Sequence, residues 1–411
     1  MNGHVGTNTS SIPVLDLAWA EDPAKKPLLL KQLHAALFDV GFLYIINHDV
    51  AKASITHLID LLPALFGLPD EEKAALSKLN SPHFLGYSGF AEETTLGKQD
   101  LREQFDFGTE LPVVWQDANA TKVVSPDQPS RSGQPQLNGH STTSPDFTQL
   151  YWRLRGPNQW PSKSSIPGFR KAVTDYHDAV QDLSYRFVHL IEETLDMPVG
   201  TFDTFFAPRQ TPGQYTDLSD PSDCKGRNMN RESLPPQHRI KLVRYPPSSS
   251  GGDGGQGVGA HKDSSGWLTF LYQVGHEEGL EVLSADGHWF PAPPIENSFV
   301  VNFGNAFEAA TEGAVKATVH RVVAPKERVR YSIPFFQGLP LDMTVSEIRS
   351  YVPEHVRMEG KLAGRSDDAI ATFLDPRWDS LGESQLRKWI RSHKDVGLKW
   401  YGREVVKYYT Q

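Results

Sequence analysis

The spacing of apolar residues predicts a first half that is mainly helical, with a few short buried strands. Apolar positions recur at the helical period over residues 22–39 and 53–66, and they form a long amphipathic stripe over residues 169–195. Runs rich in β-branched and aromatic residues predict strands over 11–17 and 41–46. Helices and strands therefore alternate before the pattern changes further along the chain.

Strand patterns separated by Gly- and Pro-rich turns dominate residues 238–338, and the C-terminal end reads as mostly helical. Trp389 and Trp400 are available to anchor that end to the core. Residues 116–147 are rich in Ser, Pro, Gln, Asn, Thr and Gly, which predicts a long surface insertion. The expected organisation is an N-terminal helix and strand region (1–110), the insertion (116–147), a helical region (148–237), a strand-rich core (238–338) and a C-terminal helical extension or lid (339–411).

Composition excludes several classes of protein. The 411 residues include 38% hydrophobic and 22% charged residues, so the chain can bury a substantial core. A net charge of −9 argues against nucleic acid or an anionic membrane as a partner, and no apolar run is long enough to span a bilayer. Cys224 is the only cysteine, which excludes a disulfide framework within the chain. Without a recognisable secretory signal, we expect a cytoplasmic protein.

The most informative chemical pattern is His261-Lys262-Asp263 followed by His320. In a β-strand, residues i and i+2 point to the same face, so His261 and Asp263 can bind one ion while Lys262 points away. His320 is placed as expected for a third ligand on a strand that returns beside the first. Two imidazoles and one carboxylate form the facial triad that binds Fe(II) and leaves positions open for oxygen chemistry. Zinc accepts the same donors.

A second pattern, Arg330-Tyr331-Ser332, lies ten residues after His320. Arg330 and Ser332 again stand at i and i+2, so a forked guanidinium and a hydroxyl share one face. This pair suits the distal carboxylate of a dicarboxylic acid. A zinc hydrolase would not obviously need an anionic co-substrate, so the pair favours iron.

These residues resemble those of the 2-oxoglutarate/Fe(II)-dependent dioxygenases of the isopenicillin N synthase-like family. The resemblance covers nearly the whole chain. Its motifs are Ile12-Pro-Val-Leu-Asp16, Gly41-Phe-Leu-Tyr44, Asn47-His48, Tyr245-Pro246-Pro247, Ala260-His-Lys-Asp263, Gly279-Leu-Glu-Val282, Trp289, Asn302-Phe-Gly304, His320-Arg-Val-Val323 and Arg330-Tyr-Ser332.

The resemblance implies an α+β fold, with a distorted double-stranded β-helix (jelly roll) flanked by helices. It also implies a reaction in which O2 and 2-oxoglutarate oxidise a small molecule by hydroxylation, desaturation or ring formation, with release of succinate and CO2. The implied residues are the iron ligands His261, Asp263 and His320, and the 2-oxoglutarate contacts Arg330, Ser332 and Tyr245.

Two departures keep other functions open. Plant members often carry Asn two residues before the tyrosine, where this chain has Val243. The run Ile333-Pro-Phe-Phe336 resembles isopenicillin N synthase itself, which uses no 2-oxoglutarate. The alternatives are therefore an iron oxidase of that kind, an ethylene-forming 2-oxoglutarate oxygenase, and a non-enzymatic binding module on the same fold.

The substrate pocket is predicted near Arg102-Glu-Gln-Phe-Asp-Phe-Gly108, which reads as a strand ending in a turn. Glu103, Phe105 and Phe107 alternate, so they share one face of that strand. An acidic residue beside two aromatic rings suits a cationic or hydroxylated small molecule. The other interpretation is an ordinary half-buried strand in which Glu103 pairs with a nearby arginine.

Overall fold

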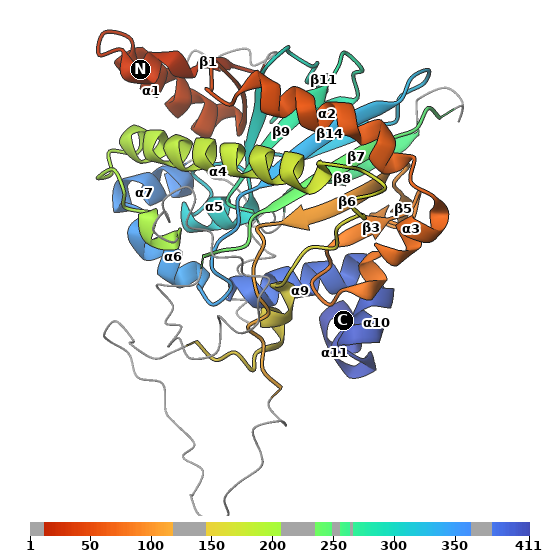
Figure 1. Ribbon diagram of the computed structural model, residues 1–411. Helices are drawn as coiled ribbons and strands as arrows, with labels where there is room; N and C mark the ends of the chain where they lie inside the picture. Colours follow the sequence, from red (N-terminus) through yellow and green to blue (C-terminus); the bar gives the residue numbers. More distant parts are fainter. Residues whose placement is uncertain (1–11, 118–144, 207–234, 249–254, 264–265, 363–379) are drawn as a thin grey trace, which may run out of the picture.

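Two β-sheets face each other at the centre of the protein, and helices surround them (Figure 1). The structure is a computed structural model. Of the predicted insertion, residues 118–144 lie outside the described residues, as does Cys224. The described residues are 12–117, 145–206, 235–248, 255–263, 266–362 and 380–411.

The larger sheet has eight strands, and most neighbouring strands in it are antiparallel. Strands from the first hundred residues extend it at both edges, so the N-terminal segment completes the sheet. The order across the sheet is β1 (Val14–Asp16), β2 (Phe42–Ile46), β12 (Phe299–Phe303), β9 (Leu268–Val274), β14 (Arg330–Phe336), β7 (Arg239–Tyr245), β6 (Glu103–Gly108) and β3 (Gly86–Ser88).

The smaller sheet has four antiparallel strands, and its β8–β13 pair sets His261 opposite His320. The third predicted ligand thus does lie on a strand that returns beside the first. The two sheets form the jelly-roll core that the sequence predicted. The strands of the smaller sheet are, in order, β11 (Trp289–Pro291), β10 (Leu280–Leu283), β13 (His320–Val323) and β8 (Gln256–His261); β4 (Thr94–Thr95) and β5 (Lys98–Gln99) form a separate hairpin.

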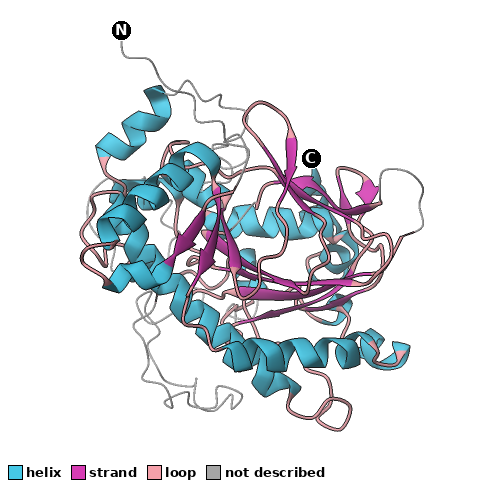
Figure 2. Ribbon diagram, turned by 90° about the horizontal axis from the view of Figure 1, so that it is seen from above, coloured by secondary structure: helices cyan, strands magenta, loops and turns pink. Residues whose placement is uncertain are grey.

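Helices α1 (Lys26–Ala35), α2 (Lys52–Phe66) and α4 (Phe169–Thr194) cover the outer face of the larger sheet (Figures 1 and 2). The ring of Phe187 on α4 meets that of Phe270 on β9 with centroids 5.7 Å apart. The bounds of α2 and α4 agree closely with the predicted helices. Burial of the apolar stripe of α4 against the sheet provides most of the stability of such a helix.

The first helix begins later than the predicted residue 22. The Asp22 carboxylate accepts a hydrogen bond from the backbone N–H of Ala24, and this bond holds residues 22–25 in a turn. Helix α1 then starts at Lys26 with Pro27 in its first turn, where a missing N–H costs nothing. It continues through one wider π-turn over Ala36–Val40.

The described residues of the C-terminal part are mainly helical, and both tryptophans anchor them to the rest of the protein. Trp389 is buried with its ring 5.7 Å from that of Phe84, and the Trp400 indole N–H donates to the Leu79 carbonyl at 3.0 Å. No helix among the described residues is both long and apolar enough to cross a membrane. The remaining helices are α3 (Asp70–Ala75), α5 (Asn305–Ala310), α6 (Val345–Tyr351), α7 (Glu354–Leu362), α9 (Leu381–Ser392), α10 (Lys394–Trp400) and α11 (Arg403–Thr410).

A buried group of charges, the Lys78 cluster (Lys78, Glu93, Asp106 and His393), joins the end of α9 to the larger sheet. Lys78 Nζ lies 2.9 Å from Glu93 Oε1 and 2.7 Å from Asp106 Oδ2, and His393 Nε2 lies 2.9 Å from Glu93 Oε1. Burial by itself raises the pKa of both carboxyls, but Lys78 and Lys241 outweigh it and hold each pKa below its ordinary range. Lys78 and the two carboxyls are therefore ionised at neutral pH, whereas burial lowers the pKa of His393.

Candidate active site

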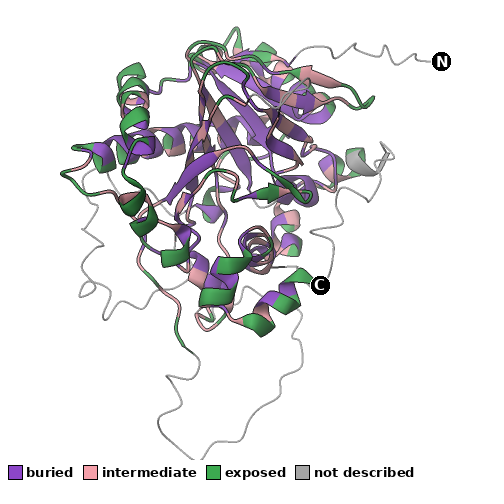
Figure 3. Ribbon diagram, turned by 90° about the vertical axis from the view of Figure 1, so that its right-hand side faces the viewer, coloured by how far each residue is buried: buried purple, intermediate pink, exposed green. Residues whose placement is uncertain are grey.

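A cavity of about 380 Å³ lies between the two sheets. The strands that enclose it are buried along most of their length (Figure 3). Alternate residues of β7 and β14 point into it from the larger sheet, while β8 and β13 close the other side and α9 covers one end. Side chains from distant parts of the sequence therefore meet in one enclosed space.

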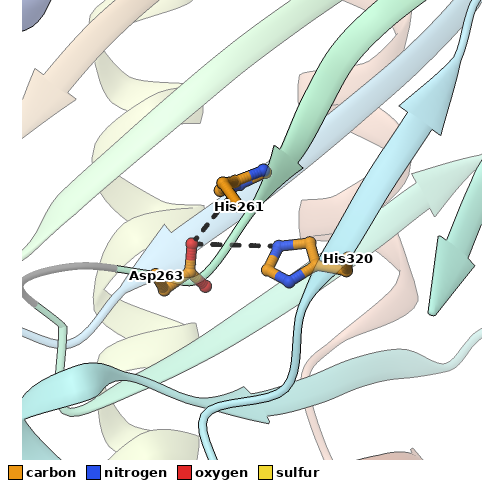
Figure 4. Close-up of side chains that lie close together, drawn as sticks. All are labelled: His261, Asp263 and His320. Carbon is orange, nitrogen blue, oxygen red and sulfur yellow. Dashed lines mark ion pairs between the residues drawn. The ribbon is translucent and has the colours of Figure 1, made fainter. Parts of the chain in front are cut away.

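His261, Asp263 and His320 gather at this cavity, with one donor atom from each within 4.8 Å of the others (Figure 4). Asp263 Oδ1 lies 3.8 Å from His261 Nε2 and 3.9 Å from His320 Nε2. Strand β8 ends at His261, so Asp263 stands just beyond the strand rather than within it. Lys262 turns to Glu308, with Nζ 3.0 Å from its carboxylate.

Both imidazoles are oriented by their own backbone. His261 Nδ1 lies 2.8 Å from the Gly259 carbonyl, and His320 Nδ1 lies 3.1 Å from the Thr318 carbonyl. A carbonyl only accepts hydrogen bonds, so each Nδ1 carries the proton and each Nε2 offers a lone pair. Burial and the neighbouring imidazole lower the pKa of His261 to about 3, which keeps that ring neutral.

The second carboxylate oxygen of Asp263 is occupied by two hydrogen bonds. Thr269 Oγ1 and Asn302 Nδ2 each donate to Oδ2 at 2.7 Å. Burial raises the pKa of Asp263, but the two imidazoles and these hydrogen bonds lower it further, so the net shift is downward. The group is an anion with Oδ1 directed at the histidines, which is how a monodentate metal ligand is held.

Arg330, Ser332 and Tyr245 line the same cavity, and Arg330 on β14 pairs in register with Tyr245 on β7. Arg330 is 1% exposed, and its guanidinium carbon stands 5.0 Å from the centre of the Tyr245 ring. Its Nη2 donates to Gln273 Oε1 at 2.8 Å, while Nε and Nη1 have no hydrogen-bond partner in the described part of the chain. Val243 also lines the cavity, next to Ser332 in register.

The structure does not bring Glu103, Phe105 and Phe107, the predicted substrate residues, to this cavity, because they lie on the opposite face of β6. Both phenylalanines are fully buried in the core beneath the helices. Glu103 accepts a hydrogen bond from Tyr87 and pairs with Arg244, as in the alternative interpretation of this strand. Glu103, Phe105 and Phe107 do share one face of β6, but that face is the one beneath the helices. The residues that alternate with them lie on the face toward the cavity.

Sequence reasoning missed several residues that shape the site. Asn302 lies in one of the family motifs, but the sequence alone gave it no role. A lone polar residue in the apolar run Phe299–Phe303 needs a buried hydrogen-bond partner, and this signal could have identified it. Gln273 holds Arg330 from β9, but nothing in its local sequence signals that contact. Lys388 and Trp389 on α9 also line the cavity, and only the folded chain brings them there.

A double-stranded β-helix with two histidines and one aspartate converging on its cavity defines an Fe(II)-binding oxygenase scaffold. Two family models match the chain. The model described as the N-terminal region of non-haem dioxygenases in morphine synthesis matches residues 12–163. The model described as the 2OG-Fe(II) oxygenase superfamily matches residues 237–338.

Similar proteins agree with these matches. The chain is 37% identical to a 2-oxoglutarate-dependent dioxygenase, frbJ, of Dothideomycetidae sp., covering 95% of this chain and 92% of that protein. A 2-oxoglutarate-dependent dioxygenase of Gibberella zeae is 30% identical, covering 97% and 93%. The crystal structure of Neurospora crassa T7H in complex with alpha-KG shares the fold, with a TM-score of 0.60, 22% identity, and coverage of 85% and 93%.

The chain therefore belongs to the 2-oxoglutarate/Fe(II)-dependent dioxygenases, which are oxidoreductases. Fe(II) is the metal of this family and 2-oxoglutarate is its co-substrate. The relatives favour this reaction over the oxidase and ethylene-forming alternatives.

Proposed function

We propose that His261 Nε2, Asp263 Oδ1 and His320 Nε2 bind Fe(II), and that Arg330, Ser332 and Tyr245 bind the distal carboxylate of 2-oxoglutarate. The observation that carries this proposal is the meeting of three converging metal donors and a buried arginine in one cavity. The donor set fits Fe(II), because two neutral imidazoles and one carboxylate on one side of an ion leave its other positions open.

The fit to 2-oxoglutarate rests on Nε and Nη1 of Arg330, which have no hydrogen-bond partner among the described residues. A buried guanidinium with two unpaired nitrogens is costly unless an anion satisfies them, and a carboxylate accepts two parallel bonds from such a fork. The Ser332 hydroxyl lies two residues further along the same face of β14, and the Tyr245 hydroxyl approaches from β7. These groups would set the position of the co-substrate relative to the metal.

When bound, Fe(II) and 2-oxoglutarate supply the oxidation of a small molecule by O2, leaving succinate and CO2. The chain's own part is to orient the ligands and to exclude water. Thr269 and Asn302 hold Asp263 in one rotamer, and two backbone carbonyls fix the histidine tautomers. The two sheets and α9 enclose the cavity, which protects the enzyme from its own oxidant.

The test uses metal-free protein reloaded with Fe(II) without oxygen, followed by measurement of bound iron and of O2 uptake with and without 2-oxoglutarate. We expect His320→Ala and Asp263→Ala to lose bound iron and turnover while circular dichroism stays unchanged. His288→Ala is the matched control, since His288 is an exposed histidine in a turn of the smaller sheet. Full iron binding in His320→Ala would show that His320 is not a ligand. O2 uptake at the same rate with and without 2-oxoglutarate would establish the oxidase alternative.

A further inference from the structure

Cations crowd one end of the cavity, around the ring of Trp389 on α9. The guanidinium carbon of Arg239 lies 4.5 Å from the centre of the Trp389 ring, and the ammonium nitrogens of Lys241 and Lys388 lie 5.6 Å and 5.9 Å from it. All four side chains line the cavity. These side chains share the cavity with His261, Asp263 and His320, so a molecule bound in it can meet both groups.

Most of these cations already have partners. Arg239 donates three hydrogen bonds to the backbone carbonyls of His83, Phe84 and Leu154. The ammonium of Lys241 lies 3.6 Å from the buried Asp106 carboxylate. Lys241 therefore has a carboxylate as partner, and Arg239 is held by neutral backbone carbonyls.

Lys388 differs from them, because no acidic group or hydrogen-bond acceptor within the described ranges contacts its ammonium. Burial lowers the pKa of Lys388 to about 8, and Asp263 is the acid that opposes this shift most strongly. In the proposed function, however, the Asp263 carboxylate binds the metal. Lys388 is then a half-buried cation that lines the cavity without a carboxylate in contact, and a bound anion would supply that partner.

Resting on the proposed function, we infer that the primary substrate is a small carboxylic acid and that the Lys388 ammonium binds its carboxylate, with Trp389 beside it. The Lys388 ammonium can contact a carboxylate directly, whereas Arg239 and Lys241 already donate to or pair with groups of the protein. The cavity also has apolar walls from Val243, Val258 and Leu271, which suit the remainder of an organic acid. Lys388 is thus assigned as a specificity-determining residue of the substrate site.

The first experiment measures protection of Lys388 from acetylation by an amine-reactive ester, in Fe(II)-loaded protein with 2-oxoglutarate and without oxygen. The probes are matched pairs of an acid and its primary amide: benzoate and benzamide, phenylacetate and phenylacetamide, hexanoate and hexanamide, alanine and alaninamide. Peptide mass spectrometry reports Lys388, and the exposed Lys407 on α11 serves as the control site. We expect at least one acid to protect Lys388 while its amide does not, with Lys407 labelled equally throughout.

The second experiment measures succinate release stimulated by the same compounds. We expect Lys388→Gln to raise the concentration of acid needed by at least about tenfold, equal to about 1.4 kcal/mol, and Lys388→Arg to raise it less. Lys407→Gln should behave as the unaltered protein. Thermal unfolding of each variant checks that the fold is retained, and the labelling experiment on the unaltered chain stands even where a variant fails to fold.

Three results would overturn the inference. The first is equal action of acids and amides, and the second is a panel in which no acid either protects Lys388 or stimulates succinate release. The third is protection of Lys388 by 2-oxoglutarate alone, which would move this lysine to the co-substrate site. Failure of the proposed function itself would be recognised by a different result. Fe(II) and 2-oxoglutarate would then produce no charge-transfer absorption in the unaltered protein.

Discussion

Replacing Arg330 by lysine separates the charge of this side chain from its geometry. The guanidinium is 1% exposed, with one nitrogen bonded to Gln273 at 2.8 Å and two nitrogens left for a ligand. A lysine keeps the positive charge, but its single nitrogen cannot bond Gln273 and also present a planar pair of N–H groups to a carboxylate. The substitution therefore removes at least one charge-assisted hydrogen bond to 2-oxoglutarate.

The expected magnitude follows from the value of that bond. A hydrogen bond to a charged group contributes about 1.5–3 kcal/mol, so Arg330→Lys should raise the Kd for 2-oxoglutarate by roughly 10- to 150-fold. Loss of both free contacts, as in Arg330→Met, should raise it further and also leave the carboxylate without a counter-charge.

The assay is an anaerobic titration of Fe(II)-loaded protein with 2-oxoglutarate, followed by calorimetry or by the visible charge-transfer absorption. Arg328→Lys is the matched control, because Arg328 lies two residues before Arg330 and its side chain is 80% exposed. An unchanged Kd in Arg330→Lys, or an equal weakening in both variants, would contradict the assignment of Arg330 to the co-substrate. Thermal unfolding without 2-oxoglutarate shows whether the variant is also destabilised.

Three further predictions concern positioning and stability. Asn302→Leu should weaken Fe(II) binding by about 10- to 100-fold, measured by metal competition, since one hydrogen bond that orients Asp263 is lost; affinity equal to that of the unaltered protein would contradict this. Glu103→Gln should lower the free energy of unfolding by about 1–3 kcal/mol without changing steady-state kinetics, and a kinetic defect alone would restore this residue to the substrate pocket. Lys78→Met should lower the free energy of unfolding by about 3–5 kcal/mol at neutral pH, against less than about 0.5 kcal/mol for Lys407→Met, because it removes a cation that two buried carboxylates share. Both carboxyls have lowered pKa values when folded, so their stabilising contribution is present above about pH 4 and lost as the pH falls; Lys78→Met should flatten this dependence in urea unfolding at a series of pH values.

The sequence by itself determined which residues are candidates for the metal site. The residues His261 and Asp263, a later His320, and the Arg330/Ser332 pair can be read directly, because ligand identity depends on residue type and the strand period of two fixes which neighbours share a face. The long helix predicted over 169–195 was equally readable from its single apolar stripe, and α4 spans 26 of those residues. Resemblance to a family supplied the fold and the roles.

Only the tertiary structure decided which face of β6 points to the cavity. Glu103, Phe105 and Phe107 alternate with residues that are also buried, so both faces of this strand are hidden from water and polarity alone does not distinguish them. The helices above the sheet require the aromatic face, and this places Glu103 beside Arg244 rather than beside a substrate.

The end of the cavity around Trp389 is likewise a product of packing over long sequence distances. Lys388 follows Asp263 by more than a hundred residues, and its local sequence shows only an amphipathic helix anchored by Trp389. Whether such a lysine faces solvent or a cavity depends on how α9 docks, and the buried contacts of Lys78 with Glu93 and Asp106 help fix the structure around that docking. Local periodicity specifies which residues share a face, whereas burial against a distant element specifies what that face meets.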